Sequence, residues 1–424
     1  MHISQIQDKL KSKTVRTLAE NFLSLSLLKV VGLITPLITL PYLARIIGTE
    51  GFGAIAFAAS VIVFVETITD WGFNYTATRD VAIAKSKNDL TRISKIFSEV
   101  ITAKACLMLL CFVLLCITIQ LIPTLRQYRL LLLLTFLYIP GHIMFPEWVF
   151  QAYEQMKYIT ILNVLSKLLF TVLIFVVIRE KSDYIYQPLL TACGYALSGI
   201  IAIIIIYRKF QIRFVRPSMK AMLARLKEGT DMFISLILPN FYTNFSTVLL
   251  KSYFGASVTG LYDAGKRLLG IMEQISQILS RVFFPFLARN RKKHRVYVVI
   301  SGSICLFSSL VMFFGGDLFI RVFFTPEFEQ AVILTKIFAF GPIGLFLMNT
   351  YGVNYLVLVK KENVLRNIII GCSIFGFILS WMITREYGAV GAAITVVSVW
   401  FIRGFVTFVM AKKEMKKDES IDCR

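Results

Sequence analysis

Residues 97–121, FSEVITAKACLMLLCFVLLCITIQL, form one apolar stretch that decides the class of fold. A helix rises about 1.5 Å per residue, so roughly 20 mainly apolar residues are needed to cross the hydrocarbon layer of a bilayer. Hydrophobic residues make up 57% of the chain and charged residues only 17%, whereas a soluble protein carries about 25% charged residues. The composition therefore indicates that lipid is the solvent of this chain.

Further stretches of the same kind lie on both sides of this one. We predict an all-α integral membrane protein with about twelve transmembrane helices. The predicted spans are 18–43, 51–74, 97–121, 130–151, 157–178, 185–207, 229–252, 260–287, 296–316, 331–358, 367–384 and 388–411.

The chain is strongly basic, with 46 Lys and Arg residues against 25 Asp and Glu residues and a formal net charge of +21. In a soluble protein this excess would indicate nucleic-acid binding. Here the basic residues gather in the two tails and in every second loop, where Lys and Arg mark the cytoplasmic face. The pattern predicts that both termini are cytoplasmic and that nucleic acid is not a partner.

A long basic segment after the sixth span divides the predicted spans into two sets of six. GTEGFG at 48–53 leads into the second span and GASVTG at 255–260 into the eighth, and in both the outer glycines are five residues apart. This similarity predicts two pseudo-symmetric six-helix bundles related by a parallel repeat. The predicted parts are an N-terminal lobe at 1–207, a cytoplasmic linker at 208–228, a C-terminal lobe at 229–411 and a cytoplasmic tail at 412–424.

Proline occurs at a similar depth in the first span of each half, as Pro36 and Pro239. Proline lacks the backbone N–H and its ring clashes with the preceding turn, so it kinks or weakens a helix. We interpret the two prolines as candidate hinges, with static kinks as the alternative.

The motifs of an enzyme are absent from the sequence. His2, His142 and His294 belong to no HExxH or zinc pattern, and there is no Walker phosphate-binding loop. The outer loops are short, which disfavours a membrane-embedded glycosyltransferase or ligase. We therefore predict no catalytic residue, no metal site and no cofactor.

Eight basic residues lie inside predicted spans, where each would cost about 2.5–3.5 kcal/mol at the helix centre on insertion scales. Such a residue must pair, reach the interface or face a water-filled cavity. Lys104 and Lys336 lie near span ends and are expected to extend to the interface. The other six are Lys29, Lys167, Lys266, Arg267, Arg281 and Arg403.

Two carboxylates of the second predicted span share one helix face, because Glu66 and Asp70 are four residues apart. In a low dielectric, two carboxylates this close favour a proton on one of them, so both are candidates for ion coupling. The alternative is that they are hydrated at the interface or paired with Arg79. Asp263 is a further coupling candidate.

Five motifs spread over nearly the whole chain resemble one known family. The motifs are LPYLARIIGTEGFG at 40–53, DWGFN at 70–74, TRDVA at 78–82, PEWVFQAYEQM at 146–156 and GLYDAGKRL at 260–268. They resemble the Wzx-type O-antigen flippases of the multidrug/oligosaccharidyl-lipid/polysaccharide (MOP) exporter superfamily. The resemblance implies two six-helix bundles that form a V around a central cavity, open alternately to each side of the membrane.

The resemblance also implies a function. It implies a multi-pass protein of the bacterial inner membrane that flips an undecaprenyl-pyrophosphate-linked oligosaccharide, such as an O-antigen repeat unit, from the cytoplasmic to the periplasmic leaflet. Similar proteins move capsule and other polysaccharide units, so the resemblance does not specify which sugars the substrate contains. Coupling to H⁺ or Na⁺ is implied, and the polysaccharide polymerase and chain-length regulator are the protein partners that it suggests.

A pyrophosphate head group needs cations in a polar cleft, and Arg binds phosphate bidentately. In this family the first and eighth spans line the cavity, which favours Lys29 and Arg267. The further candidates are Lys167, Lys266, Arg281 and Arg403. The alternative for each is a structural charge that reaches the interface or pairs with a carboxylate.

For Lys266 the expected partner would be Asp263 or Glu273. Because adjacent residues on a helix point about 100° apart, Lys266 and Arg267 are not expected to face the cavity together. Side chains that would contact the sugars are Asn74, Asn240, Tyr242 and Asn244, with packing or interface roles as their alternative.

Two other functions compete with the flippase. A drug or small-cation antiporter of the same fold would need unpaired carboxylates in its cavity, whereas the excess of cations within the spans favours a phosphate-bearing substrate. A membrane-embedded polymerase acting on the same glycolipid would need a large outer loop, and the sequence has none.

Overall fold

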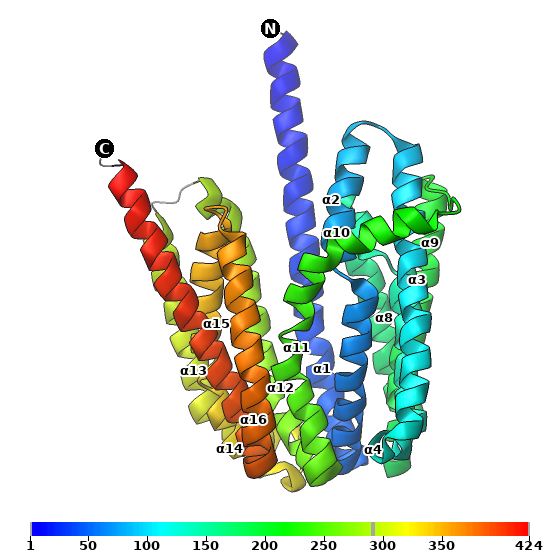
Figure 1. Cartoon of the computed structure of the whole chain (residues 1–424), viewed down its shortest axis with the longest axis vertical. Helices are drawn as coiled ribbons and strands as arrows, with labels where there is room; N and C mark the ends of the chain where they lie inside the picture. The colour runs from blue at the N-terminus through cyan, green and yellow to red at the C-terminus, as the bar shows by residue number, and fades with distance from the viewer. Residues whose placement is uncertain (1, 290–292, 423–424) are drawn as a thin grey trace. The chain divides into compact units, whose positions relative to one another are not determined.

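The computed structural model describes residues 2–289 and 293–422, and most of these residues are helical (Figure 1). No strand occurs in these two ranges. The predicted all-α fold is confirmed.

Within the described ranges, nine helical segments are long and apolar enough to cross a membrane. Three of them are Val30–Ser86, Met219–Phe284 and Glu362–Lys417, with 57, 66 and 56 residues, where one crossing needs about 20. Inside each of these segments one long helix is interrupted by a glycine with non-helical dihedral angles, and these are Gly48, Gly255 and Gly388. These glycines lie in or beside the loops predicted between two spans. Each long segment therefore contains more than one predicted span, which is why there are fewer segments than predicted spans. The count of twelve stays a prediction.

The chain divides into two compact units. The first comprises residues up to Thr39, Val65–Arg179 and Ile185–Phe233. Its elements are the two ends of α1 (His2–Asp70), α2 (Phe73–Ser86), α3 (Leu90–Leu121), α4 (Pro123–Gln127), α5 (Arg129–Phe136), α6 (Tyr138–Met144), α7 (Glu147–Ala152), α8 (Met156–Val177), α9 (Gln187–Lys209) and most of α10 (Met219–Ile237).

The core of the first unit is aromatic. Phe73, Phe97, Trp148 and Phe150 are completely or almost completely buried in one cluster. At the start of α3 the side chain of Asp89 accepts a hydrogen bond of 2.8 Å from the backbone N–H of Arg92, which satisfies one of the free donors of the first turn.

The second unit comprises Leu40–Phe64, Glu180–Tyr184 and the chain from Ile234 onward. Its elements are the middle of α1, α11 (Asn240–Thr243), α12 (Phe245–Arg289), α13 (His294–Phe323), α14 (Ala331–Phe338), α15 (Gly341–Leu347), the π-helix η4 (Met348–Val357) and α16 (Glu362–Asp422), with the 3₁₀ turns η1 (Lys181–Tyr186), shared with the first unit, and η3 (Pro326–Phe328).

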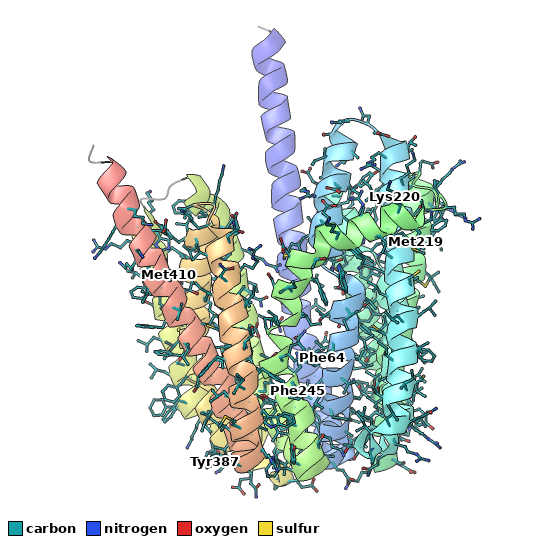
Figure 2. The ribbon with its side chains drawn as sticks, viewed as in Figure 1. Phe64, Met219, Lys220, Phe245, Tyr387 and Met410 are labelled. Carbon is teal, nitrogen blue, oxygen red and sulfur yellow. The ribbon has the colours of Figure 1, made fainter. Side chains whose placement is uncertain are left out.

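This division differs from the sequence-based lobes at residues 40–64, which belong to the second unit. The proposed linker also differs from a plain loop: residues 211–218 carry no helix, but α10 begins at Met219. Figure 1 shows α10 crosswise to α3 of the same unit, and Figure 2 labels its first residues, Met219 and Lys220. The lobe boundaries remain a prediction.

The two glycine motifs pack against each other within the second unit. A Cβ atom on Gly53 would lie 1.7 Å from the carbonyl oxygen of Ala256, and one on Gly260 would lie 2.1 Å from that of Thr49. Thr49 follows Gly48 as Ala256 follows Gly255, so the two contacts are reciprocal. Only glycine allows this close approach of two backbones, and the reciprocity supports the predicted repeat.

The two prolines behave differently. Helix α1 continues through Pro36, and its non-helical residue is Gly48. At Pro239, by contrast, α10 has already ended at Ile237 and the short α11 begins at Asn240. The hinge roles stay predictions, but only Pro239 coincides with a break between helices.

Large apolar side chains point away from both units. Leu121, Phe314 and Leu318 are between 67% and 75% exposed, and Figure 2 shows side chains of this kind projecting around the helices, including Tyr387 and Met410. Helices of this length with apolar outer faces are stable in lipid, where the backbone satisfies its own hydrogen bonds. The chain is a multi-pass membrane protein.

Candidate functional site

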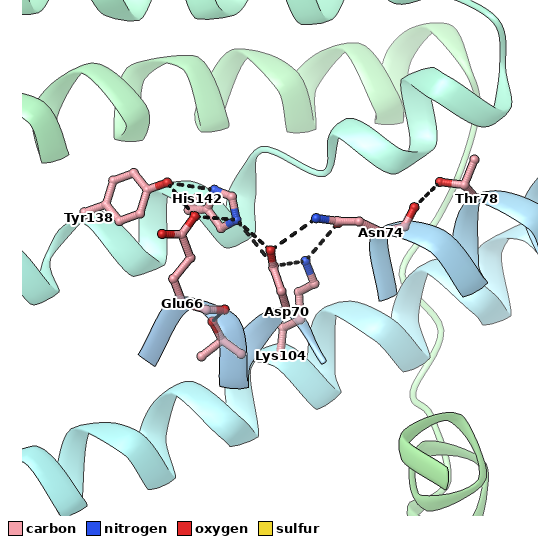
Figure 3. Close-up of polar contacts among 8 residues, drawn as sticks. Glu66, Asp70, Asn74, Thr78, Lys104, Tyr138 and His142 are labelled. Atoms are coloured by element: carbon pink, nitrogen blue, oxygen red, sulfur yellow. Dashed lines mark hydrogen bonds and ion pairs between the residues drawn. The ribbon is translucent and has the colours of Figure 1, made fainter. Parts of the chain in front are cut away.

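A cluster of charged and hydrogen-bonding side chains lies inside the first unit, where α1 ends (Figure 3). The last two turns of α1 carry both carboxylates of the cluster, and α2, α3 and α6 supply its other members. The cluster comprises Glu66, Asp70, Asn74, Lys104, Tyr138 and His142.

Asp70 lies at the centre of this cluster. The Lys104 ammonium is 2.7 Å from Asp70 Oδ1 and 3.4 Å from Asn74 Oδ1. The amide of Asn74 donates to Asp70 Oδ2 over 3.1 Å, and His142 Nε2 lies 3.3 Å from Asp70 Oδ1. Asp70 is therefore bonded by three different side chains.

Glu66 is bound more loosely. The hydroxyl of Tyr138 donates to Glu66 Oε1 over 3.1 Å, and the same hydroxyl lies 3.2 Å from His142 Nδ1. His142 Nε2 is 3.9 Å from Glu66 Oε1. A continuous set of polar contacts therefore runs from Glu66 through Tyr138 and His142 to Asp70.

The charges of the cluster balance when it holds one extra proton. Two carboxylates and one ammonium carry a net charge of −1, and a proton on the imidazole or on Glu66 brings it to zero. Lys104 is only 3% exposed, and an uncompensated charge at such a site is costly. The arrangement is therefore suited to gaining and losing a single proton.

The cluster also has some features of a cation site. One ligand atom each of Glu66, Asp70 and His142 can be chosen so that all lie within 4.8 Å of one another. Lys104, however, already occupies positions beside Asp70 and Asn74 that a metal cation would need.

The sequence predicted part of this cluster. Glu66 and Asp70 do lie together, but Arg79 pairs with Asp80 and Glu228, so the alternative that it neutralises them is wrong. The expectation that Lys104 extends to the interface is also wrong, because its side chain is buried and its ammonium pairs with Asp70.

Tyr138 and His142 were missed as members of the cluster. The available signal was their spacing of four residues, which places two polar side chains on one face of an otherwise apolar span. Asn74, predicted to contact sugar, instead bonds to Asp70.

The second unit contains a pocket with a volume of about 410 Å³, whose walls combine apolar side chains with several polar and charged ones. Its walls come from α11, α12, α15, η4 and α16. Five predicted site residues line it: Pro239, Tyr242, Asn244, Lys266 and Arg403. The other polar or aromatic lining residues include Glu273, Gln277, Asn349 and Trp400.

Two cations of this pocket have no carboxylate at ion-pair distance among the described residues. Lys266 Nζ is 3.3 Å from the carbonyl oxygen of Thr243 and 5.7 Å from the ring centre of Tyr262. The Nε atom of Arg403 is buried without a hydrogen-bond partner, while its guanidinium contacts the hydroxyl of Tyr242. Among the described side chains neither cation has a carboxylate at ion-pair distance, although the charges of Asp263 and Glu273 act on Lys266. Arg403 is therefore the cation that is freer to bind an anionic ligand.

Arg267, which the resemblance favoured, lies elsewhere. Its guanidinium is 2.9 Å from Asp263, four residues earlier on α12, and 4.9 Å from the ring centre of Phe52. This also answers two other expectations: Asp263 is paired with Arg267, not with Lys266, and the two adjacent cations point in different directions.

The remaining candidates do not line this pocket. Lys167 is partly buried on α8, in the other unit, and Arg281 is exposed on α12. Asn240 bonds to Asn244, with Asn244 Nδ2 2.9 Å from Asn240 Oδ1. Lys29 lies on α1, but its side chain is outside the described part of the structure, so its role stays a prediction.

Comparison with known proteins gives relatives over nearly the whole chain. A protein of Escherichia coli (strain K12) named "Putative O-antigen transporter" is 25% identical over 390 residues, which cover 90% of this chain and 94% of the relative. A protein of the same name from Shigella dysenteriae is 25% identical over 403 residues, covering 93% and 99%.

Two solved structures share the fold. The structure of the lipid II flippase MurJ in an inward closed conformation has a TM-score of 0.76 and 15% identity, and the match covers 93% of this chain and 87% of that one. An inward-facing multidrug resistance MATE family transporter of the MOP superfamily has a TM-score of 0.67 and 13% identity, covering 91% and 96%. At these identities the likeness shows the fold alone.

The match to a family model is more direct. The model described as "Polysaccharide biosynthesis protein" matches residues 18–291, which is more than half of the chain. The matched range includes the charged cluster of the first unit and the α11 and α12 walls of the pocket. The chain therefore belongs to the polysaccharide biosynthesis protein family.

Proposed function

We propose that this chain is a flippase for an undecaprenyl-pyrophosphate-linked oligosaccharide, such as an O-antigen repeat unit, in the bacterial inner membrane. The names of the O-antigen transporter relatives support this substrate class. The protein moves the head group from the cytoplasmic to the periplasmic leaflet by alternating access, and the polyprenyl tail stays in lipid.

The observation that carries this proposal is that Arg403 and Lys266 line one pocket of the second unit, and neither has a carboxylate at ion-pair distance among the described residues. Arg403 binds the phosphate oxygens through its guanidinium, and Lys266 adds a point charge. Trp400, Tyr242, Asn244 and Asn349 also line the pocket, so aromatic rings and amides lie beside the two cations. The combination of cations, rings and amides matches a phosphorylated glycan better than an apolar drug.

The size of the pocket limits what it holds. Small-molecule pockets span roughly 300–1,000 Å³, and about 410 Å³ is near the lower end of that range. The pocket therefore takes the pyrophosphate and the adjoining sugar, and the remainder of the oligosaccharide extends beyond it.

We also propose that a proton, and not sodium, drives the cycle. The cluster in the first unit becomes neutral when it gains one proton, and the Tyr138 hydroxyl connects Glu66 to His142. Sodium would need several oxygen ligands, but Lys104 already neutralises Asp70 and contacts Asn74.

The test uses purified protein in vesicles that contain a labelled undecaprenyl-pyrophosphate-linked oligosaccharide. Wild-type protein should move the label between leaflets, and Arg403→Ala should not, although it should insert to the same level. Gly371→Ala is a matched control, because nothing lies within 4 Å of the added Cβ and the residue is outside the pocket. Flipping by Arg403→Ala at the wild-type rate would refute the pocket's role.

The same vesicles test the driving ion. Transport should respond to an imposed proton gradient and should be indifferent to replacing sodium with potassium. Transport that persists with neither gradient would remove the coupling proposal while leaving the flippase intact.

The alternative is a drug or small-cation antiporter of the same fold. Glu273 in the pocket is the feature that favours it, but Gln277 donates a hydrogen bond to that carboxylate and two cations share the same walls. Export of cationic dyes without any movement of the glycolipid would establish the alternative. A polysaccharide polymerase and chain-length regulator are the partners proposed for the flippase, and co-purification would test them.

A further inference from the structure

The joint between α1 and α2 has an unusual backbone. Trp71 and Gly72 follow Asp70 directly, with φ angles of 41° and 74°. Gly72 adopts a positive φ without difficulty, but for a bulky side chain such as Trp71 this region is a genuine outlier. Strain of this kind persists only when surrounding contacts hold it.

The contacts that hold Trp71 come from α10. Its indole Nε1 donates to the carbonyl oxygen of Leu226 over 2.8 Å, and its ring stacks on Phe233 with centres 4.0 Å apart and planes 5° from parallel. The fit leaves no spare room, because a Cβ on Gly229 would lie 2.5 Å from the carbonyl oxygen of Trp71 and one on Gly72 would lie 2.8 Å from Met232 Cβ.

A second set of contacts fixes α10 next to this joint. Arg225 is 7% exposed, pairs with Asp80 of α2 and lies 2.9 Å from Glu99 of α3. A buried arginine held by carboxylates from two helices makes α10 a docked element of the first unit and not a free linker.

The helix α10 connects the first unit to the second along the chain. Phe233, on which Trp71 stacks, is the last residue of the first unit, and the chain enters the second unit at Ile234. Four residues later α10 has ended, and Pro239, Tyr242 and Asn244 line the cationic pocket. Trp71 is also the residue that follows Asp70 in the chain, and Asp70 is the centre of the charged cluster.

We propose that Trp71 is a positioning residue that ties the charge state of the cluster to the placement of α10, and through α10 to the helix that lines the pocket. A change at Asp70 shifts the strained joint, and the indole transfers that shift to Leu226 and Phe233. The proposal gives the flippase its link between ion and substrate, so its biological meaning rests on the proposed function, while its test does not.

The experiment measures amide hydrogen exchange along 222–237 in the full-length protein in detergent, with and without Asp70→Asn. In the wild-type background, Asp70→Asn should change the exchange rates of α10. In a Trp71→Ala background this difference should be lost. No response in the wild-type background, or an equal response without the indole, would overturn the proposal, because demonstrated coupling is what a transmission claim requires.

Two further variants guard against simple misfolding. Trp71→Phe keeps a ring on Phe233 but loses the donor to Leu226, so part of the response should remain. Gly229→Ala adds a Cβ that would collide with the carbonyl oxygen of Trp71 and so push α10 away from the joint, without changing a residue of the cluster. It should reduce the response as Trp71→Ala does. A full response in Gly229→Ala would contradict the proposal.

Trp381→Ala serves as the matched control, because this tryptophan stacks on Phe245 in the second unit and is 45% exposed. It should keep the full response of α10. The exchange measurement needs no substrate. A failure of glycolipid transport in vesicles would therefore refute the proposed function without affecting the exchange result, and a failed exchange experiment would refute the role of Trp71 without affecting the proposed function.

Discussion

The charged cluster of the first unit and the cationic pocket of the second unit use buried charge in opposite ways. In the cluster, Asp70 is bonded by Lys104, Asn74 and His142, and each charge has a partner. In the pocket, Lys266 and Arg403 have no carboxylate at ion-pair distance among the described residues, although Asp263 and Glu273 act on Lys266 from farther away. One nitrogen of Arg403 is buried without a hydrogen bond.

This difference separates two tasks. A cluster that is internally compensated changes state when one proton enters or leaves, and it has no vacant charge for a large ligand. A pocket that keeps its cations unpaired carries a cost of burial that an anionic ligand removes on binding. Substitutions that remove a partner in the cluster should affect stability and ion-driven transport, whereas substitutions in the pocket should affect binding of the glycolipid.

The largest effect is expected from Lys104→Met. This substitution leaves Asp70 and Glu66 together without their cation, and breaking a buried pair costs about 3–5 kcal/mol. Thermal unfolding in detergent should therefore shift to a clearly lower temperature. The double variant Lys104→Met with Asp70→Asn should recover stability but not proton-driven transport; a single variant as stable as wild type would show that the pair is not structurally important.

A large effect on binding, without loss of stability, is expected from Arg403→Ala. Hydrogen bonds to charged groups contribute about 1.5–3 kcal/mol, which corresponds to roughly 10- to 100-fold weaker binding of the glycolipid. Titration of the purified protein with the lipid-linked oligosaccharide measures this change. Arg403→Lys should retain part of the affinity, since it keeps the charge but loses the bidentate geometry.

A moderate effect is expected from Tyr138→Phe, which removes only the hydroxyl between Glu66 and His142. A typical hydrogen bond contributes about 1 kcal/mol, so gradient-driven transport should slow by roughly fivefold, with glycolipid affinity unchanged. Parallel transport and binding measurements separate the two properties. A loss of affinity equal to that of Arg403→Ala would contradict the division of tasks.

The smallest effect is expected from Arg267→Ala. The Arg267–Asp263 pair is partly exposed, with 38% of the Arg267 side chain accessible, and such pairs contribute about 0–1 kcal/mol. Surface polysaccharide in cells should stay close to the wild-type amount. If Arg267→Ala abolishes it as completely as Arg403→Ala, the substrate path extends to this face of α12, as the family resemblance implies.

Much of the fold follows from local features of the sequence. Apolar runs such as 97–121 are long enough to be helices in lipid regardless of what they pack against. The glycines at 48 and 255 mark breaks because a positive φ suits glycine. Glu66 and Asp70 could be assigned to one face because the helix period is fixed.

Other features depend on contacts between segments that are far apart in the chain. The sequence does not show that Lys104 and His142 reach Asp70, or that Lys266 and not its neighbour Arg267 joins Arg403 in one pocket. It also does not show that the basic linker contains a helix docked on Trp71.

Local sequence patterns are thus enough to specify a helical membrane protein and to identify which charged residues lie within its apolar segments. The pairing of those charges, and which of them line a pocket, depends on how the helices pack. The physical reason is that helix periodicity and hydrophobicity act over a few turns, whereas ion pairing inside a membrane protein depends on side chains of separate helices meeting within about 4 Å.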